Sequence, residues 1–97
     1  MEYSAGELAI LQALLDVYRD MPEVPLLGMT MRFRESHEVE AARSLKAKGV
    51  AETRCYRGDP IGSINVGVNK AGADEMARLF NVGVLTKFEE REPAKTD

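Results

Sequence analysis

Apolar residues near the start of the chain recur at the spacing of one helix face. This stripe comprises Leu8, Leu11, Leu14, Leu15 and Tyr18, while the polar residues Glu7, Gln12, Asp16 and Arg19 are expected to lie outside it. Ser4 and Glu7 fit a capping box, in which each side chain satisfies a backbone N–H of the first turn. Pro22 and Pro25 cannot donate the hydrogen bonds that a longer helix requires. The pattern predicts a helix over residues 5–20.

The stretch from residue 26 to residue 35 fits two patterns. Apolar and other residues alternate, which predicts a half-buried strand whose two arginines, Arg32 and Arg34, face outward. On a short helix, Leu26, Met29, Thr30 and Phe33 would instead share one face. Because the run is too short for periodicity to choose between the two, strand and helix both remain open.

A second helix is predicted from about residue 37 to residue 48. Ser36 is its expected N-cap, and acidic residues in the first turn and lysines in the last turn suit the helix dipole. Gly49 fits the left-handed position that closes a helix in a Schellman motif, with Val50 folding back onto Leu45. The expected buried seam of this helix is Val39, Ala42 and Leu45.

A hairpin and a third helix follow. Residues 51–57 are rich in strand-forming residues, Gly58-Asp59-Pro60 is typical of a turn, and residues 64–68 alternate between branched apolar residues and small or polar ones. Asn69 is the expected N-cap of a helix over residues 70–80, which Asn81 or Gly83 ends. The apolar stripe of that helix is Ala73, Met76, Ala77 and Phe80.

Together these elements predict one α+β domain over residues 1–88. Its order is helix, short strand or helix, helix, β-hairpin and C-terminal helix. The apolar residues within 82–88 are expected to pack on this domain or on a partner chain. Residues 89–97 are rich in charge and are expected to form a disordered tail.

Composition narrows the class of protein. The 97 residues suffice for one hydrophobic core, and 44% hydrophobic with 30% charged residues are globular proportions. One cysteine and one histidine are too few for an internal disulfide or a structural zinc site. The sequence also has no recognisable nucleophile–base pair or nucleotide-binding loop. We expect no enzyme activity, no cofactor and no metal. The chain lacks a basic, apolar leader and any apolar run near ~20 residues, so a cytoplasmic protein without a membrane span is expected.

The charge of the chain is unevenly distributed. The net charge is −3, which argues against a protein coated in positive charge. Residues 32–57, however, hold seven basic and four acidic residues, a net charge of +3, whereas the segments on either side are acidic. A local positive surface is therefore expected in the middle of the chain.

Two sequence blocks resemble the winged helix-turn-helix superfamily, particularly MarR- and PadR-like bacterial regulators. Residues 42–52, Ala-Arg-Ser-Leu-Lys-Ala-Lys-Gly-Val-Ala-Glu, resemble the end of a recognition helix running into the wing, and residues 68–72, Val-Asn-Lys-Ala-Gly, resemble the Leu-Thr-x-x-Gly sequence that leaves it. The resemblance covers about residues 36–80. It implies a small winged-helix-like domain with a recognition helix at about 36–48 and a wing at about 53–68.

This resemblance predicts a transcriptional regulator that binds duplex DNA. In such a fold, a helix end enters the major groove and basic residues of the wing follow the DNA backbone. A homodimer is expected because two-fold pairing doubles the base contacts across a palindrome, with the first helix and residues 82–88 as the contact surfaces. The candidate DNA-binding residues are Arg32, Arg34, Ser36, His37, Glu40, Arg43, Arg54 and Arg57.

The alternative is a winged-helix-like protein–protein interaction module without DNA binding. The acidic balance of the whole chain favours it. The second helix of a helix-turn-helix would also have to fit between Pro25 and Ser36, where the pattern is equally typical of a strand. The backbone of residues 26–35 therefore separates the two hypotheses, because a helix there completes the DNA-reading unit and a strand dismantles it.

Overall fold

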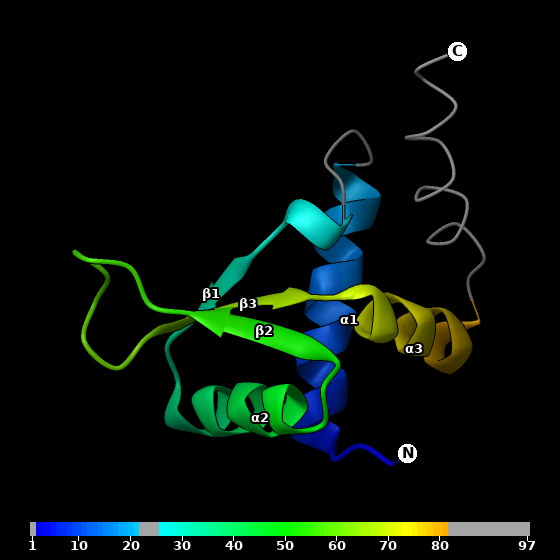
Figure 1. The fold of residues 1–97 in the computed structure, drawn as a ribbon, viewed down its shortest axis with the longest axis horizontal. Coiled ribbons are helices and arrows are strands. Elements are labelled where there is room, and N and C mark those ends of the chain that lie inside the picture. Colours follow the sequence, from blue (N-terminus) through cyan, green and yellow to red (C-terminus); the bar gives the residue numbers. More distant parts are fainter. Residues whose placement is uncertain (1, 22–25, 82–97) are drawn as a thin grey trace.

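The computed structural model describes residues 2–21 and 26–81. Within them the chain forms three α-helices and a three-stranded antiparallel sheet, which confirms the predicted α+β class (Figure 1). The elements in chain order are α1 (Ala5–Asp20), the 3-10 turn η1 (Leu26–Gly28), β1 (Met31–Phe33), α2 (Ser36–Ala47), β2 (Ala51–Arg54), β3 (Ile64–Val68) and α3 (Lys70–Phe80).

Residues 26–35 form a short 3-10 turn followed by a strand. β1 pairs antiparallel with β3, with Met31 opposite Val66 and Phe33 opposite Ile64. Phe33 is buried and Arg32 is exposed, as the alternating pattern predicts. Of the two alternatives, the strand is correct over 31–33. β1 leads directly into α2, and β2 follows α2. One helix alone therefore separates β1 from β2, and every residue between these two strands is described.

The sheet has two faces of different character. β3 lies in the centre, in the order β1-β3-β2, and all five of its residues are buried. Ile64, Val66 and Val68 belong to the hydrophobic core, together with residues of the helices. Figure 1 shows α2 along one side of the sheet and α1 crossing behind it. We call the side of the sheet that faces away from α1 and α2 the outer face. Strand alternation places five residues on it: Arg32, Glu52, Arg54, Asn65 and Gly67.

The buried side of α1 differs from the predicted stripe at its first turn. Leu11, Leu14 and Leu15 are fully buried as predicted, and Ile10 joins them, whereas Leu8 is only half-buried. The prediction that Glu7 lies off the stripe is wrong, because its side chain is buried. Residues 7, 11, 14 and 18 follow one another at four-, three- and four-residue steps, so a carboxylate occupies the N-terminal end of the apolar stripe.

α2 begins one residue before its predicted start and ends one residue before its predicted end, at Ala47. Its N-cap is Glu35 rather than Ser36, which is the first helical residue, and the Glu38 carboxylate accepts a hydrogen bond from the Glu35 backbone N–H at 3.2 Å. Gly49 has φ 82°, and its N–H donates to the Lys46 carbonyl at 2.9 Å. The Val50 N–H donates to the Leu45 carbonyl at 3.2 Å, which completes the Schellman motif. The buried residues are Ala41, Ala42 and Leu45, while Val39 is half-buried.

α3 starts with the predicted cap and touches the start of β2. The Asn69 side chain accepts from the Gly72 N–H at 2.9 Å and donates to the Gly49 carbonyl at 2.9 Å. A Cβ built on Gly72 would overlap the carbonyl oxygen of Val50, so glycine is what lets α3 approach the end of the α2–β2 connection. Asn81 ends the helix in the left-handed conformation, at φ 53°. The segment 82–88 and the tail 89–97 lie outside the described residues.

Candidate binding surface

The eight candidate DNA-binding residues are all exposed, but they lie on two separate surfaces. The first group follows the outer face and the hairpin, where Arg32 and Arg54 flank Asn65 on the two neighbouring strands. The second group lies on or just before α2, which covers the other side of the sheet (Figure 1). The first group is Arg32, Arg54 and Arg57, and the second is Ser36, His37, Glu40 and Arg43 on α2, preceded by Arg34.

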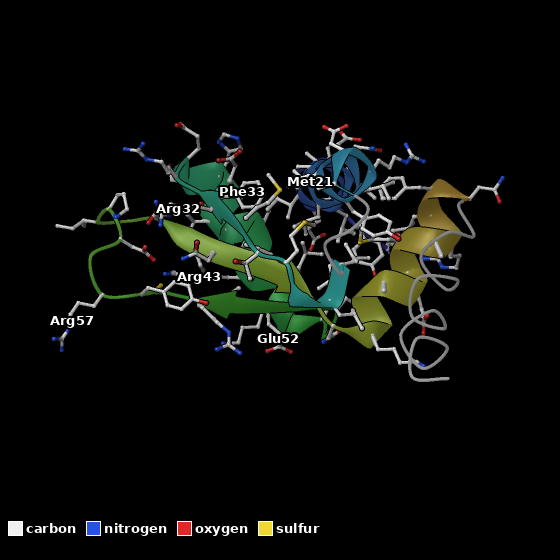
Figure 2. All side chains as sticks on the ribbon, turned by 90° about the horizontal axis from the view of Figure 1, so that it is seen from above. Met21, Arg32, Phe33, Arg43, Glu52 and Arg57 are labelled. Atoms are coloured by element: carbon white, nitrogen blue, oxygen red, sulfur yellow. The ribbon has the colours of Figure 1, made fainter. Side chains whose placement is uncertain are left out.

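Asp59 fixes the hairpin loop to the outer face. Its carboxylate accepts hydrogen bonds from the Tyr56 backbone N–H at 2.9 Å, from the Asn65 amide at 2.8 Å and from the Arg32 guanidinium at 2.8 Å. The Tyr56 N–H is the largest of the influences that lower the pKa of Asp59, and Asn65 and Arg32 add to it. Arg32 is therefore held within the chain, while Figure 2 shows Arg57 projecting from the loop beyond the sheet.

A hollow of about 290 Å³ lies on the outer face beside the hairpin. Gly67, in the central strand, is part of its lining and lies between Thr30 on one side and Glu52 on the other. A Cβ on Gly67 would lie 2.8 Å from the Met29 carbonyl oxygen, so the chain before β1 also passes close to β3 here. Leu27, Arg54 and Tyr56 complete the rim.

The rim of the hollow combines apolar surface with one unpaired cation. Leu27 is 41% exposed and Tyr56 is 51% exposed, and they are two of the large apolar side chains that the described residues leave in solvent. The Glu52 carboxylate accepts a hydrogen bond from the Asn69 amide at 3.3 Å. Arg54, in contrast, makes no ion pair within the described part of the chain. The hollow is thus suited to a ligand that has both an apolar group and a negative charge.

A second polar cluster joins the start of α1, the end of α2 and the middle of α3. The Lys48 ammonium donates to Glu7 Oε1 at 2.7 Å and to the Glu2 carbonyl at 2.8 Å, and it lies 5.0 Å from the centre of the Tyr3 ring. The Tyr3 hydroxyl donates to Glu75 Oε1 at 2.8 Å, and Arg78 pairs with the same carboxylate. The network therefore connects α1, the end of α2 and α3.

The pKa values in this network favour the charged carboxylates. Burial alone would raise the pKa of Glu7, but hydrogen bonds from the Lys48 ammonium and the Ser4 backbone N–H outweigh it and lower the pKa to about 2. Arg78, followed by Tyr3, lowers the pKa of Glu75 to about 2. Burial, together with the hydrogen bond to Glu75, raises the pKa of Tyr3 to about 12. Each group keeps its ordinary charge at neutral pH, so the ion pairs of the network are intact there.

Sequence reasoning missed both the hollow and the network, although each had a signal. Gly67 was the signal for the hollow, because a glycine inside a strand leaves a gap on one face or permits a close approach of backbone. Glu7 was the signal for the network, because its spacing from Leu11 places it on the apolar stripe. Its partner Lys48 lies 41 residues away, and no local pattern could identify it.

A comparison of the chain with protein-family models, with curated proteins and with solved structures found no match. Among the described helices, none is both long enough and apolar enough to cross a membrane. Within residues 2–21 and 26–81, no three histidine, cysteine, aspartate or glutamate side chains are grouped so that they could hold a metal ion.

Proposed function

We propose that this chain is a protein–protein interaction module built on a winged-helix-like scaffold, and that it does not read DNA. The strand order β1-β3-β2 and the helix that leads into the hairpin support the scaffold. The observation that carries the functional part is the single helix between β1 and β2. A helix-turn-helix needs two consecutive helices there, one crossing the DNA backbone and one lying in the groove.

The charge of α2 supports the same proposal. Over Ser36–Ala47 the helix has two acidic residues, Glu38 and Glu40, and two basic ones, Arg43 and Lys46. Glu40 and Arg43 are both exposed, so the helix that would face the DNA has no excess of positive charge. Phosphate binding depends on several clustered cations, and a protein surface imposes no such requirement.

Binding to labelled random-sequence duplex, followed by fluorescence anisotropy at about 50 mM salt, tests the negative half of the proposal. We expect no saturable binding, and no difference between the wild type and Arg43→Ala. Saturable binding that weakens with salt and with Arg43→Ala would overturn the proposal.

Photo-crosslinking tests the other half of the proposal, that the chain binds another protein. A photoreactive amino acid is placed at Tyr56, beside the hollow, and at Asp16, on the exposed side of α1, as the control. We expect the Tyr56 position to yield one discrete protein adduct that resists nuclease, and the Asp16 position to yield none. An adduct that nuclease removes, or equal adducts at both positions, would contradict the proposal.

A DNA-binding regulator remains the second candidate, because one observation favours it. Arg34, Arg43, Arg54 and Arg57 are exposed, and none of them makes an ion pair within the described residues. Unpaired arginines suit an anionic partner, whether phosphate or carboxylate. The homodimer stays a prediction: of its two expected contact surfaces, the first helix packs Leu11, Leu14 and Leu15 into the chain's own core, and residues 82–88 lie outside the described residues.

A further inference from the structure

The hollow over Gly67 has the features of a peptide-docking site. Its floor is backbone of the central strand, and its rim holds the exposed apolar side chains Leu27 and Tyr56. Exposed apolar side chains around a concavity are typical of a binding site. The volume of about 290 Å³ exceeds that of any one apolar side chain, so a single side chain fits with part of its backbone.

The position of the hollow in the sheet favours an extended ligand. β2 is one of the two edge strands in the order β1-β3-β2, and Figure 2 shows it on the side of the sheet away from α1. Glu52 and Arg54 are alternate residues of this edge strand and both line the hollow. A segment that lies along β2 therefore passes Arg54 and Glu52 in turn, because side chains on one face of a strand are about 7 Å apart.

The charges around the hollow specify the ligand further. Glu52 already accepts a hydrogen bond from Asn69, and Arg32 is already paired with Asp59. Arg54 is the cation of the rim that has no such partner in the described part of the chain. A carboxylate is the group whose geometry and charge complement a guanidinium.

We propose that the hollow binds a linear segment of a partner protein, which inserts one apolar side chain between Leu27 and Tyr56 and sets an Asp or Glu carboxylate against Arg54. This proposal rests on the proposed function and names its site and the chemistry of its partner. A DNA phosphate would complement Arg54 equally well, but it would make no use of Leu27 and Tyr56. The apolar rim is what favours a peptide over a nucleic acid.

The test is selection of a phage-displayed library of random peptides against the full chain. We expect the selected peptides to share an apolar residue within two positions of an Asp or Glu. Replacing that acidic residue, or introducing Arg54→Ala or Leu27→Ala into the protein, should weaken binding about tenfold or more. The backbone N–H of Gly67 should shift in the NMR spectrum when the peptide is added.

The matched control is Arg57→Ala, which removes an arginine of the same hairpin that does not line the hollow. It should leave the affinity unchanged. Leu27 and Arg54 are both exposed, so their variants should fold, and unchanged thermal unfolding midpoints verify this. The charge reversal Arg54→Glu should transfer the preference from acidic to basic peptides.

Three outcomes would overturn the proposal. The first is selected peptides without a shared carboxylate, and the second is equal loss of binding with Arg54→Ala and Arg57→Ala. In both cases peptides still bind, so the proposed function as an interaction module is retained and only the proposed binding site is wrong. The third is enrichment of no peptide, which overturns the proposed site; if the chain also binds labelled duplex DNA saturably, the proposed function fails as well.

Discussion

The buried carboxylate of Glu7 ties the start of α1 to the end of α2. It completes the capping box of α1 by accepting from the Ser4 backbone N–H at 2.7 Å, and it also accepts from the ammonium of Lys48 at 2.7 Å. The side chain of Glu7 is 3% exposed and that of Lys48 is 29% exposed. Removing one partner of such a pair costs more than the pair contributes, because it leaves the other charge without compensation.

The first prediction concerns the pH dependence of stability. The pKa of Glu7 is lowered from 4.5 to about 2 on folding, so the stabilisation is fully present above pH 4.5 and is lost as the pH falls toward 2. Glu75 acts in the same direction. We expect the free energy of unfolding, measured by urea denaturation, to fall by about 2 kcal/mol between pH 5 and pH 2.5 because of Glu7.

The control for this prediction is a pair of variants. Glu7→Gln should be less stable than the wild type at pH 7 and should lose less stability on acidification. Glu40→Gln, which alters an exposed carboxylate of α2, should reproduce the wild-type pH dependence. An equally steep loss in Glu7→Gln would show that other carboxylates govern the acid unfolding.

The second prediction is for the other partner of the pair. Lys48→Met keeps most of the aliphatic length of the side chain but removes the ammonium that faces Glu7 and the Tyr3 ring. We expect the free energy of unfolding at pH 7 to fall by about 2 kcal/mol, less than for a fully buried pair because Lys48 is partly exposed. The double variant Lys48→Met with Glu7→Gln should recover part of this loss, and additive losses would exclude direct coupling.

At the scale of elements, Gly72 and Gly6 allow a comparison of the same substitution in two helices. Gly72→Ala would drive a Cβ into the Val50 carbonyl oxygen, so we expect a loss of about 3 kcal/mol in urea denaturation. Gly6→Ala in α1 would place a Cβ 3.5 Å from the Ala41 Cβ, an ordinary contact, and should stabilise by up to about 1 kcal/mol. Equal effects of the two substitutions would show that α3 does not approach β2 this closely.

A further prediction concerns the hairpin loop. Asp59→Ala removes the acceptor shared by Tyr56, Asn65 and Arg32. We expect faster hydrogen exchange at the amides of residues 55–63, and unchanged exchange in α1, because no residue of α1 bonds to Asp59. Asp74→Ala, which alters an exposed aspartate of α3, is the control and should leave the loop unchanged.

The helices were predictable from the sequence because their signals are local. Capping residues, apolar spacing and the glycine after α2 lie within a few positions of the ends they define, so the ends of α1 and α3 agree with prediction. β1 could not be distinguished from a helix by its own three residues. It is a strand because Phe33 faces the core while its backbone pairs with β3, thirty or more residues later in the chain.

The candidate site was less predictable than the fold for the same reason. The sequence identified exposed arginines correctly, since charged residues on helices and strand faces reach solvent. It could not show that Asp59 pairs with Arg32, or that Thr30 and Glu52 line one hollow with Gly67, because these contacts join residues far apart in the chain. Which arginine remains available to a partner is therefore a property of the tertiary structure.

At the scale of the whole molecule, the described core combines all three helices with the sheet, and its residues range from Ile10 to Met76. α1, which the sequence also assigned to a dimer contact, contributes Leu11, Leu14 and Leu15 to this core. The sequence separately predicts that the apolar residues within 82–88 pack on this domain or on a partner chain.

Truncation after Asn81 separates those two roles of residues 82–88. We expect the shortened chain to keep its helical circular dichroism and a cooperative thermal transition, with a midpoint lowered by no more than about 4–8 °C, which corresponds to about 1 kcal/mol. If the full chain self-associates through residues 82–88, sedimentation velocity should show that the shortened chain does not. An unfolded truncated chain would place residues 82–88 in the core of the domain. A control that removes only residues 89–97 should match the full chain in both measurements, because six of these nine residues are charged and none has a large apolar side chain.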